Sequence, residues 1–350
     1  MIRLGVLCSG VILHWHMYGV DRNDNVTIGA IASRNEASSK GAIEKYGAAY
    51  YKTAAELLKN ETQLDGILNL SPNHLHVETC EMAIDAGFRF IFCEKPLGNE
   101  IGQTKKLLEK AEASDTQLQV GYMRRFHPGF LKVKEALDLL GEIHFVNFTT
   151  IESGAANQIS QRDTSSPWKS DPVLSGGGNL THVGSHMIDF LRFLFGDIEH
   201  VRCKLKRDKP DVPEYHAKAC VTFNSGVDAD IRIGRVDVPD LGPDWGIFKN
   251  GWNESIEVVA ENGYIRVSNN SWEGFGPTCV TSWFKDEPGP KTEYFDSKLQ
   301  WVNEIGSFVK GIESGKLVHE ATTASDAYAV ALTIRKMRES AENQGEPVFL

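Results

Sequence analysis

The sequence predicts an α/β protein of two domains, with a doubly wound parallel sheet over residues 1–122 and a largely antiparallel sheet over residues 123–350. Short apolar runs alternate with helix-like patterns as far as residue 121, which is typical of βαβ units. Beyond Gly141 the pattern changes to β-like runs joined by turns rich in Gly, Pro, Asn and Asp. The length of 350 residues also exceeds one ordinary hydrophobic core.

The expected elements of the first domain follow one another regularly. Strands are expected at residues 2–7, 26–32, 66–70, 90–93 and 118–121. Helices are expected directly after the first strand and at residues 36–46, 54–59, 74–86 and 101–113. Because open parallel sheets bind ligands beyond the carboxyl ends of their strands, the residues that follow each strand are the candidates for a binding site.

The first strand is followed by a turn at the place where a dinucleotide-binding fold carries G-x-G-x-x-G. The glycines of that motif let backbone N–H groups approach a pyrophosphate at a helix N-terminus. Only the middle glycine, Gly10, is present, with Cys8 and Leu13 at the other two positions, so an ordinary β–α turn is the alternative. The residues expected to hold a cofactor here are Cys8, Ser9, Gly10, Val11 and Ile12.

The second strand ends in Ser33-Arg34. An acidic residue at this position would bind the ribose hydroxyls of NAD, whereas Ser with Arg leaves space and positive charge for the additional phosphate of NADP. The sequence therefore predicts NADP, with NAD as the other possibility. An arginine at a solvated helix start gives the same pattern.

The apolar run at residues 90–93 ends abruptly in Glu94-Lys95-Pro96. An unbroken run of this kind is typical of a central strand covered on both faces. Lys95 is then expected at the carboxyl end of the strand, where a lysine can contact a reacting oxygen. A solvated exit from the strand is the alternative. Polar groups that can face a cofactor follow other strands as well. The further cofactor-binding candidates are Ser71, Pro72, Asn73, His76, Glu94, Lys95 and Met123.

The second domain is expected to consist mainly of strands. They are predicted at residues 143–151, 201–205, 217–223, 227–233, 255–260, 264–267 and 279–284, with helices at 179–195, 299–313 and 324–343. The polar connection at 152–175 contains groups suited to a polyol, among them a tryptophan that offers an apolar platform for a sugar face. The substrate-binding candidates are Arg124, Asn157, Trp168, Lys169, His182 and His186.

The helix predicted at 179–195 follows three consecutive glycines and carries His182, His186 and Asp189 at positions i, i+4 and i+7. This spacing places all three on one helix face. Two histidines at i and i+4 are also suited to bind a metal, but no third ligand is evident, so no metal is expected. Asp189 is the candidate for a structural partner on this face.

Composition excludes several classes of function. A net charge of −10 without a Lys/Arg-rich block argues against nucleic acid and against an anionic membrane surface, so a small molecule is the expected ligand. The six cysteines are far apart and form no CxxC, which argues against a disulfide framework and a zinc ribbon and favours a reducing cytoplasm. The first apolar stretch is too short for a signal peptide, and no run reaches membrane-spanning length.

Taken together, these motifs resemble the glucose-fructose oxidoreductase / inositol dehydrogenase / rhizopine catabolism (Gfo/Idh/MocA) family of NAD(P)-dependent oxidoreductases. The resemblance spans nearly the whole chain, through the first βα turn, SPNHLH, EKP, GYMRRFHP, the helix of His186 and Asp189, and the final GEP. It implies a Rossmann domain followed by an α/β domain with an open, mostly antiparallel sheet. It also implies that Lys95 and His186 lie beside the nicotinamide ring.

The resemblance implies hydride transfer between a nicotinamide cofactor and a secondary hydroxyl or ketone of a sugar, cyclitol or sugar derivative. His186 would accept the hydroxyl proton and Lys95 would stabilise the alkoxide. The family usually has an aspartate where this chain has His182, whose ring can still bind a substrate hydroxyl, so the expected catalytic residues are Lys95, His186 and His182. A cofactor-binding sensor or regulator of the same fold is the alternative. The expected assembly is a homodimer or homotetramer formed through the C-terminal sheet.

Overall fold

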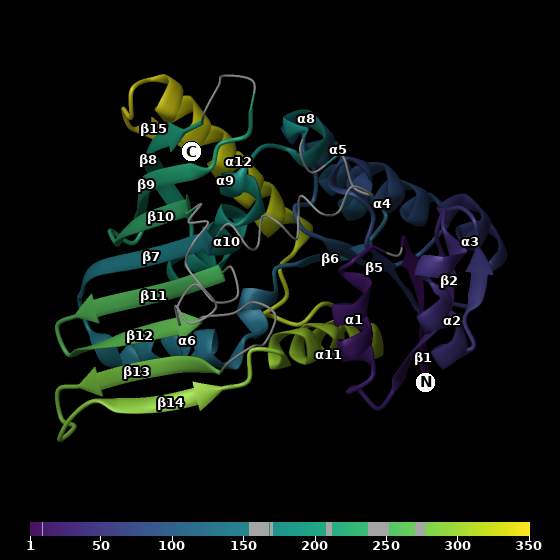
Figure 1. The fold of residues 1–350 in the computed structure, drawn as a ribbon, viewed down its shortest axis with the longest axis horizontal. Helices are drawn as coiled ribbons and strands as arrows, with labels where there is room; N and C mark the ends of the chain where they lie inside the picture. Colours follow the sequence, from purple (N-terminus) through teal and green to yellow (C-terminus); the bar gives the residue numbers. More distant parts are fainter. Residues whose placement is uncertain (9, 154–167, 169–170, 208–211, 237–251, 270–276) are drawn as a thin grey trace. The chain divides into compact units, whose positions relative to one another are not determined.

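The computed structural model describes residues 1–8, 10–153, 168, 171–207, 212–236, 252–269 and 277–350. These residues form two compact units (Figure 1). The first unit comprises Met1–Phe126 and Leu299–Ala331, and the second comprises His127–Lys298 and Leu332–Leu350. Among the described helices, none combines the length and apolarity that a membrane crossing requires.

The described part of the first unit contains a six-stranded parallel sheet. Its order is β3-β2-β1-β4-β5-β6, which is that of a doubly wound dinucleotide-binding sheet. The predicted Rossmann fold is therefore confirmed, and its switch point lies at the carboxyl ends of β1 and β4, where such sheets bind ligands. The strands are β1 (Ile2–Leu7), β2 (Val26–Ala32), β3 (Ala49–Tyr51), β4 (Gly66–Asn69), β5 (Phe90–Glu94) and β6 (Gln117–Gly121).

Helices and short 3-10 turns connect these strands. The α-helices of the first unit are α1 (Leu13–Val20), α2 (Lys40–Tyr46), α3 (Ala54–Asn60), α4 (His76–Asp85), α5 (Ile101–Ala113) and α11 (Leu299–Ser314). The 3-10 turns are η1 (Glu36–Ser38), η2 (Asn73–Leu75) and η3 (Met123–Phe126). The single helix expected at residues 36–46 is thus a 3-10 turn followed by α2, because the Asn35 side chain caps η1 by accepting from Ala37 N.

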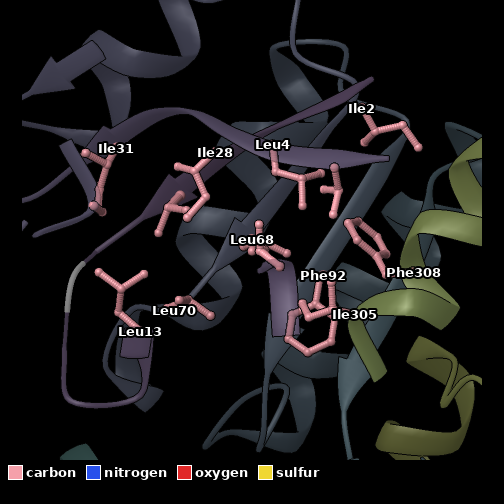
Figure 2. Close-up of a cluster of buried hydrophobic side chains, with 14 of the residues drawn as sticks. Ile2, Leu4, Leu13, Ile28, Ile31, Leu68, Leu70, Phe92, Ile305 and Phe308 are labelled. Atoms are coloured by element: carbon pink, nitrogen blue, oxygen red, sulfur yellow. The ribbon is translucent and has the colours of Figure 1, made fainter. Parts of the chain in front are cut away.

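A hydrophobic core lies between this sheet and α11 (Figure 2). Leu4, Leu68 and Phe92, from three neighbouring strands, belong to one cluster with Ile305 and Phe308 of α11. The rings of Phe92 and Phe308 meet edge to face with centroids 5.8 Å apart. Every residue of β5 is buried, so the strand that precedes Lys95 is covered on both faces, as its apolar run predicted, although it lies next to the edge strand β6 and not at the centre of the sheet.

The second unit is built on a sheet of nine described strands in the order β14-β13-β12-β11-β7-β10-β9-β8-β15. Neighbouring strands are antiparallel except β10 and β7, which are parallel, so the mostly antiparallel sheet is confirmed. Figure 1 shows β10, β7, β11, β12, β13 and β14 side by side in that order. The strands are β7 (Ile143–Ser153), β8 (Ile198–Lys206), β9 (His216–Phe223), β10 (Asp228–Val236), β11 (Trp252–Ala260), β12 (Gly263–Asn269), β13 (Thr278–Phe284), β14 (Lys291–Phe295) and β15 (Val348–Phe349).

The helix expected at residues 179–195 is two helices, α9 (Asn179–His182) and α10 (Gly184–Phe195), so the single-helix prediction is wrong. The chain breaks at Val183. A Cβ at Gly184 would lie 2.7 Å from Ile233 Cδ1 on β10, so glycine is what allows α10 to begin this close to the sheet. The other helices of this unit are α6 (Pro128–Leu140), which packs against β11–β14, α8 (Pro172–Ser175) and α12 (Ala324–Glu342), whose first residues lie in the first unit.

Three strands carried no usable sequence signal. The three residues of β3 are all only half-buried, and most of β14 is exposed, so neither shows an apolar alternation. Strand β15 has two residues. Helix α6 begins at Pro128, where the His127 side chain accepts from the N–H groups of Gly129 and Phe130. The sequence does carry signals for this helix, namely a proline at the first helical position and the apolar residues Phe130, Val133, Ala136 and Leu140 at helical spacing.

Candidate active site

The turn after β1 has space for a ligand backbone at Gly10. Among the described residues, a Cβ there would meet no atom within 4 Å, and no side chain caps α1, whose first turn follows. An open turn before a helix N-terminus fits a pyrophosphate. Cys8 has a φ of 76°, a left-handed conformation that a glycine normally takes. Leu13, which replaces the third glycine, is 5% exposed and belongs to the core cluster (Figure 2).

The residues after β2 form a small polar turn. Ser33 is buried, and its hydroxyl donates to Asn35 O at 3.2 Å, while its own carbonyl accepts from the Tyr50 hydroxyl at 2.7 Å. Arg34 is exposed, and within the described part of the chain its guanidinium forms no ion pair. This turn therefore offers a fixed serine and a cation that is accessible to an anion.

The exit from β5 places Lys95 between two buried residues. Glu94 is 8% exposed, and its Oε2 accepts from the backbone N–H of Lys95 at 3.1 Å. The Lys95-Pro96 peptide bond is cis, and Lys95 is half-buried. On the neighbouring strand, a Cβ at Gly121 would lie 3.2 Å from Glu94 Oε1, so glycine leaves the carboxylate its space.

Glu94 is paired with His16 of α1. The Nε2 atom of His16 lies 2.9 Å from Glu94 Oε1, and the ring packs edge to face on Phe92 and Trp301. Burial raises the pKa of Glu94, but the hydrogen bond from His16, together with the charge of Lys95, holds that pKa below its usual value. The carboxylate is therefore ionised at neutral pH. The folded protein stabilises this ionised form, and the stabilisation is lost only as the pH falls through the lowered pKa.

A second histidine joins the exits of β4 and β5. His76 is 1% exposed, with Nδ1 2.6 Å from Pro96 O and Nε2 2.7 Å from Ser71 O. Ser71 donates from Oγ to Asn69 Oδ1 at 2.7 Å, and Asn69 Nδ2 donates to His76 O at 3.1 Å. Burial lowers the pKa of His76, against the two carbonyl contacts and the Glu94 charge, which raise it. The two strand exits are thus fixed to each other.

The residues after β6 are less accessible than expected. Met123 is 5% exposed, and Arg124 is fully buried. The Arg124 Nη1 donates to Gln300 Oε1 of α11 at 2.5 Å. This contact gives Arg124 a role in attaching α11 to the first unit. The cofactor candidates Pro72 and Asn73, half-buried and buried respectively, lie at the start of η2.

In the second unit, the predicted histidines lie on either side of the helix break. His182 ends α9 and is half-buried, whereas His186 lies in the first turn of α10 and is 2% exposed. The backbone N–H of His186 donates to Val183 O at 3.1 Å. Asp189 follows and is fully buried. The pair is therefore carried by two helices, of which α9 has only four residues and is held by other contacts.

Those contacts come from Glu214 and Arg338. The N–H of Gly178 donates to Glu214 Oε1 at 3.1 Å, and the N–H of Asn179 donates to Glu214 O at 2.9 Å. Arg338 of α12 donates from Nη2 to Thr181 Oγ1 at 2.7 Å and to Glu214 Oε1 at 3.2 Å. A Cβ at Gly178 would overlap the Glu214 backbone. The glycines before α9 thus permit a close approach that holds the helix carrying His182.

The remaining substrate candidates are on the connection after β7. Trp168 is half-buried, and Asn157 and Lys169 lie outside the described residues. Over the described ranges, no three His, Cys, Asp or Glu side chains gather in a way that could hold a metal ion.

Two family models match the chain. Residues 2–122 match the oxidoreductase family with an NAD-binding Rossmann fold, and residues 130–266 match the GFO/IDH/MocA C-terminal domain. The chain belongs to the Gfo/Idh/MocA family. This Gfo/Idh/MocA protein is thus an oxidoreductase that transfers a hydride between a nicotinamide cofactor and a CH–OH group.

Relatives extend over the full length of this Gfo/Idh/MocA protein. Inositol 2-dehydrogenase of Rhizobium meliloti is 24% identical over 98% of each chain. A crystal structure of an oxidoreductase from Agrobacterium radiobacter with NAD+, L-tartaric acid and magnesium has a TM-score of 0.79 at 18% identity, covering 99% of this chain and 98% of that one. KijD10, a 3-ketoreductase from Actinomadura kijaniata crystallised with TDP-benzene and NADP, has a TM-score of 0.73 at 21% identity over 97% of each chain. These structures share the fold.

Sequence reasoning missed several residues that shape this Gfo/Idh/MocA site. His16 received no role, although it follows Leu13 by three residues and precedes Val20 by four, which places it on the buried face of α1. A histidine on a core-facing stripe is a detectable signal. Glu214 and Arg338 carried no such signal, because they come from a loop and a helix that only the fold brings together.

Proposed function

We propose that this oxidoreductase interconverts a secondary hydroxyl and a ketone on a sugar, cyclitol or sugar derivative, with NADP(H) as its cofactor. The observation that carries the proposal is Lys95, fixed at the carboxyl end of β5 in a sheet of Rossmann order. The name of the inositol 2-dehydrogenase relative supports the substrate class.

Each candidate residue has a chemical role in this proposal. The nicotinamide ring, when bound, accepts or donates the hydride. Lys95 stabilises the alkoxide, His186 takes up the hydroxyl proton, and His182 contacts the substrate. Gly10 and the start of α1 hold the pyrophosphate, while Ser33 and Arg34 hold the ribose and its phosphate. Trp168, Asn157 and Lys169 are the proposed substrate contacts outside the two histidines.

The test is a panel of polyols and sugars assayed with NADP+ and with NAD+. Because Arg34 is exposed and neither Ser33 nor Arg34 at the end of β2 is acidic, we expect NADPH to bind more tightly than NADH by about 10-fold or more, the value of one charge-assisted contact. Isothermal titration of the two reduced cofactors measures this difference, and the panel identifies the substrate class.

The variant Arg34→Ala should remove most of the preference for NADPH while leaving NADH binding unchanged. Arg22→Ala provides a matched control, because this arginine lies over the Tyr18 ring at 3.6 Å, away from the β2 exit. Equal affinities of the parent protein for both cofactors would show that the preference was assigned incorrectly.

A second test concerns His182. Since two nearby histidines disfavour double protonation, one of them stays neutral and available as the base. In His182→Asn the acid limb of the pH–activity profile should therefore shift, while the dissociation constant of NADPH stays unchanged. His200→Asn, in β8, serves as the matched control. An unshifted limb would assign His182 to packing.

We further propose that the chain forms a homodimer or homotetramer through its nine-stranded sheet and works in the cytoplasm. One face of the sheet carries charges of both signs, which supports its association with the same face of a second copy of the chain. On this face Arg266 lies opposite Glu257 on the neighbouring strand, and the two residues line a hollow of about 250 Å³ together with Arg232. All six cysteines are free thiols, which suits a reducing compartment.

A further inference from the structure

Lys95 lies between two peptide units that are both held by buried side chains. On one side, the Lys95 N–H donates to the carboxylate of Glu94 at 3.1 Å. On the other side, the carbonyl of Pro96 lies 2.6 Å from His76 Nδ1. Since a side chain can be no better placed than its own Cα, the groups that hold these two peptide units also determine where the Lys95 ammonium can reach.

The carboxylate of Glu94 is itself held from α1. His16 is fully buried between Phe92 and Trp301, and its Nε2 donates to Glu94 Oε1 at 2.9 Å. Its Nδ1 has no hydrogen-bond partner among the described residues, which fits a neutral ring with the proton on Nε2. One carboxylate oxygen therefore faces His16 and the other faces the Lys95 backbone.

The carbonyl of Pro96 is held from α4. His76 is anchored in turn, because its backbone carbonyl accepts from Asn69 Nδ2 at 3.1 Å and its Nε2 lies 2.7 Å from Ser71 O. The charged and titratable groups that act on this ring are Glu94 and Lys95. Both ring nitrogens face carbonyl oxygens, which accept hydrogen bonds and donate none, so the ring donates to Pro96 O whenever Nδ1 carries a proton.

We propose that His16 and His76 form a histidine clamp that positions Lys95, with His16 acting through Glu94 and His76 acting through Pro96. The two histidines touch neither the substrate nor the hydride, so they are positioning residues. The clamp rests on the proposed catalytic role of Lys95. A displacement of about 1 Å at a reacting group can cost about 100-fold in rate, which makes two separate anchors chemically significant.

The test compares His16→Leu and His76→Leu with the parent protein. Each is expected to lower kcat by about 10- to 100-fold while changing KM and the NADPH dissociation constant less than about threefold, because the defect lies in the placement of Lys95. His16→Gln and His76→Gln keep an N–H donor and should recover most of the lost kcat. His319→Leu is the matched control, since this histidine is exposed and belongs to the first unit but has no part in the proposed site.

Two spectroscopic readouts keep the proposal testable if a leucine variant does not fold. In 15N-histidine spectra of the parent protein, His16 should carry its proton on Nε2 and His76 on Nδ1 at neutral pH. The Lys95 amide proton should move upfield in His16→Gln less than in Glu94→Ala, since the glutamine still orients the carboxylate. The opposite tautomer at either ring, or leucine variants with parental kcat, would overturn the clamp.

The same data separate the clamp from the proposed function. If Lys95→Ala retains turnover, the catalytic role of Lys95 fails, whereas the ring tautomers and the Lys95 amide resonance still report whether the clamp exists. If Lys95→Ala is inactive but both leucine variants keep the parental kcat, the proposed function stands and the clamp is wrong.

Discussion

Replacing Lys95 by Ala is expected to lower kcat/KM by about 1,000-fold for any polyol that the parent protein oxidises, because the developing alkoxide loses its positive partner in a site that otherwise stays organised. The Lys95 side chain extends from the end of β5, and its neighbours Glu94 and Pro96 keep their own contacts to His16 and His76. Thermal unfolding and NADPH titration should therefore remain close to those of the parent. Steady-state kinetics measures the effect.

Two further variants sharpen this result. Lys95→Met keeps most of the side-chain volume without the charge and should be as inactive as the alanine variant. Lys106→Ala removes an exposed lysine of α5 in the same unit and should be fully active. If both Lys95 variants stay within tenfold of the parent, a group other than Lys95 stabilises the alkoxide. A parent protein that binds cofactor but turns over no polyol would instead favour a sensor function.

Replacing Gly178 by Ala is expected to destabilise the second unit by about 3 kcal/mol, because the added Cβ would overlap the backbone of Glu214, which cannot move aside as a flexible side chain could. Relief would require α9 to separate from Glu214, so the contacts at Gly178 and Asn179 would be lost together. Since α9 carries His182, activity should fall as well. Chemical denaturation of the two proteins measures the change.

The matched control for this variant is Gly289→Ala. A Cβ at Gly289 meets no atom within 4 Å, so the substitution should change the free energy of unfolding by less than about 0.5 kcal/mol. A Gly178→Ala protein as stable as the parent would mean that the loop of Glu214 moves to make room for the added Cβ. The glycines before α9 would then not be required for the packing of α9.

The sequence contained enough to predict the chemistry of the site but not how it is held. Lys95 was identifiable because an apolar run ends abruptly in Glu-Lys-Pro, and the carboxyl end of a strand is where open parallel sheets bind ligands. Arg124 shows the opposite case. Its place after β6 predicted a substrate contact, yet its guanidinium is buried against Gln300, which is far away in sequence.

Helix α11 and the break at Val183 also depended on tertiary packing. A pattern of apolar residues predicts that a helix is amphipathic, but it carries no record of which sheet the apolar face covers. Ile305 and Phe308 cover the parallel sheet of the first unit (Figure 2), although strands β7 to β14 separate them from it in the chain. The break at Val183 is followed directly by Gly184, where an added Cβ would lie 2.7 Å from Ile233 Cδ1.

Local rules of the chain thus determined the fold class, the parallel and antiparallel sheets, and the strand exits that carry Lys95, Ser33 and Arg34, because periodicity and turn chemistry act over a few residues. The tertiary structure alone decided that His16 reaches Glu94 and that Arg338 reaches Glu214. Those contacts join residues 78 and 124 positions apart, and their formation depends on how whole elements pack. No local pattern encodes such a distance, since a buried polar group requires only some partner and any suitably placed element can supply it.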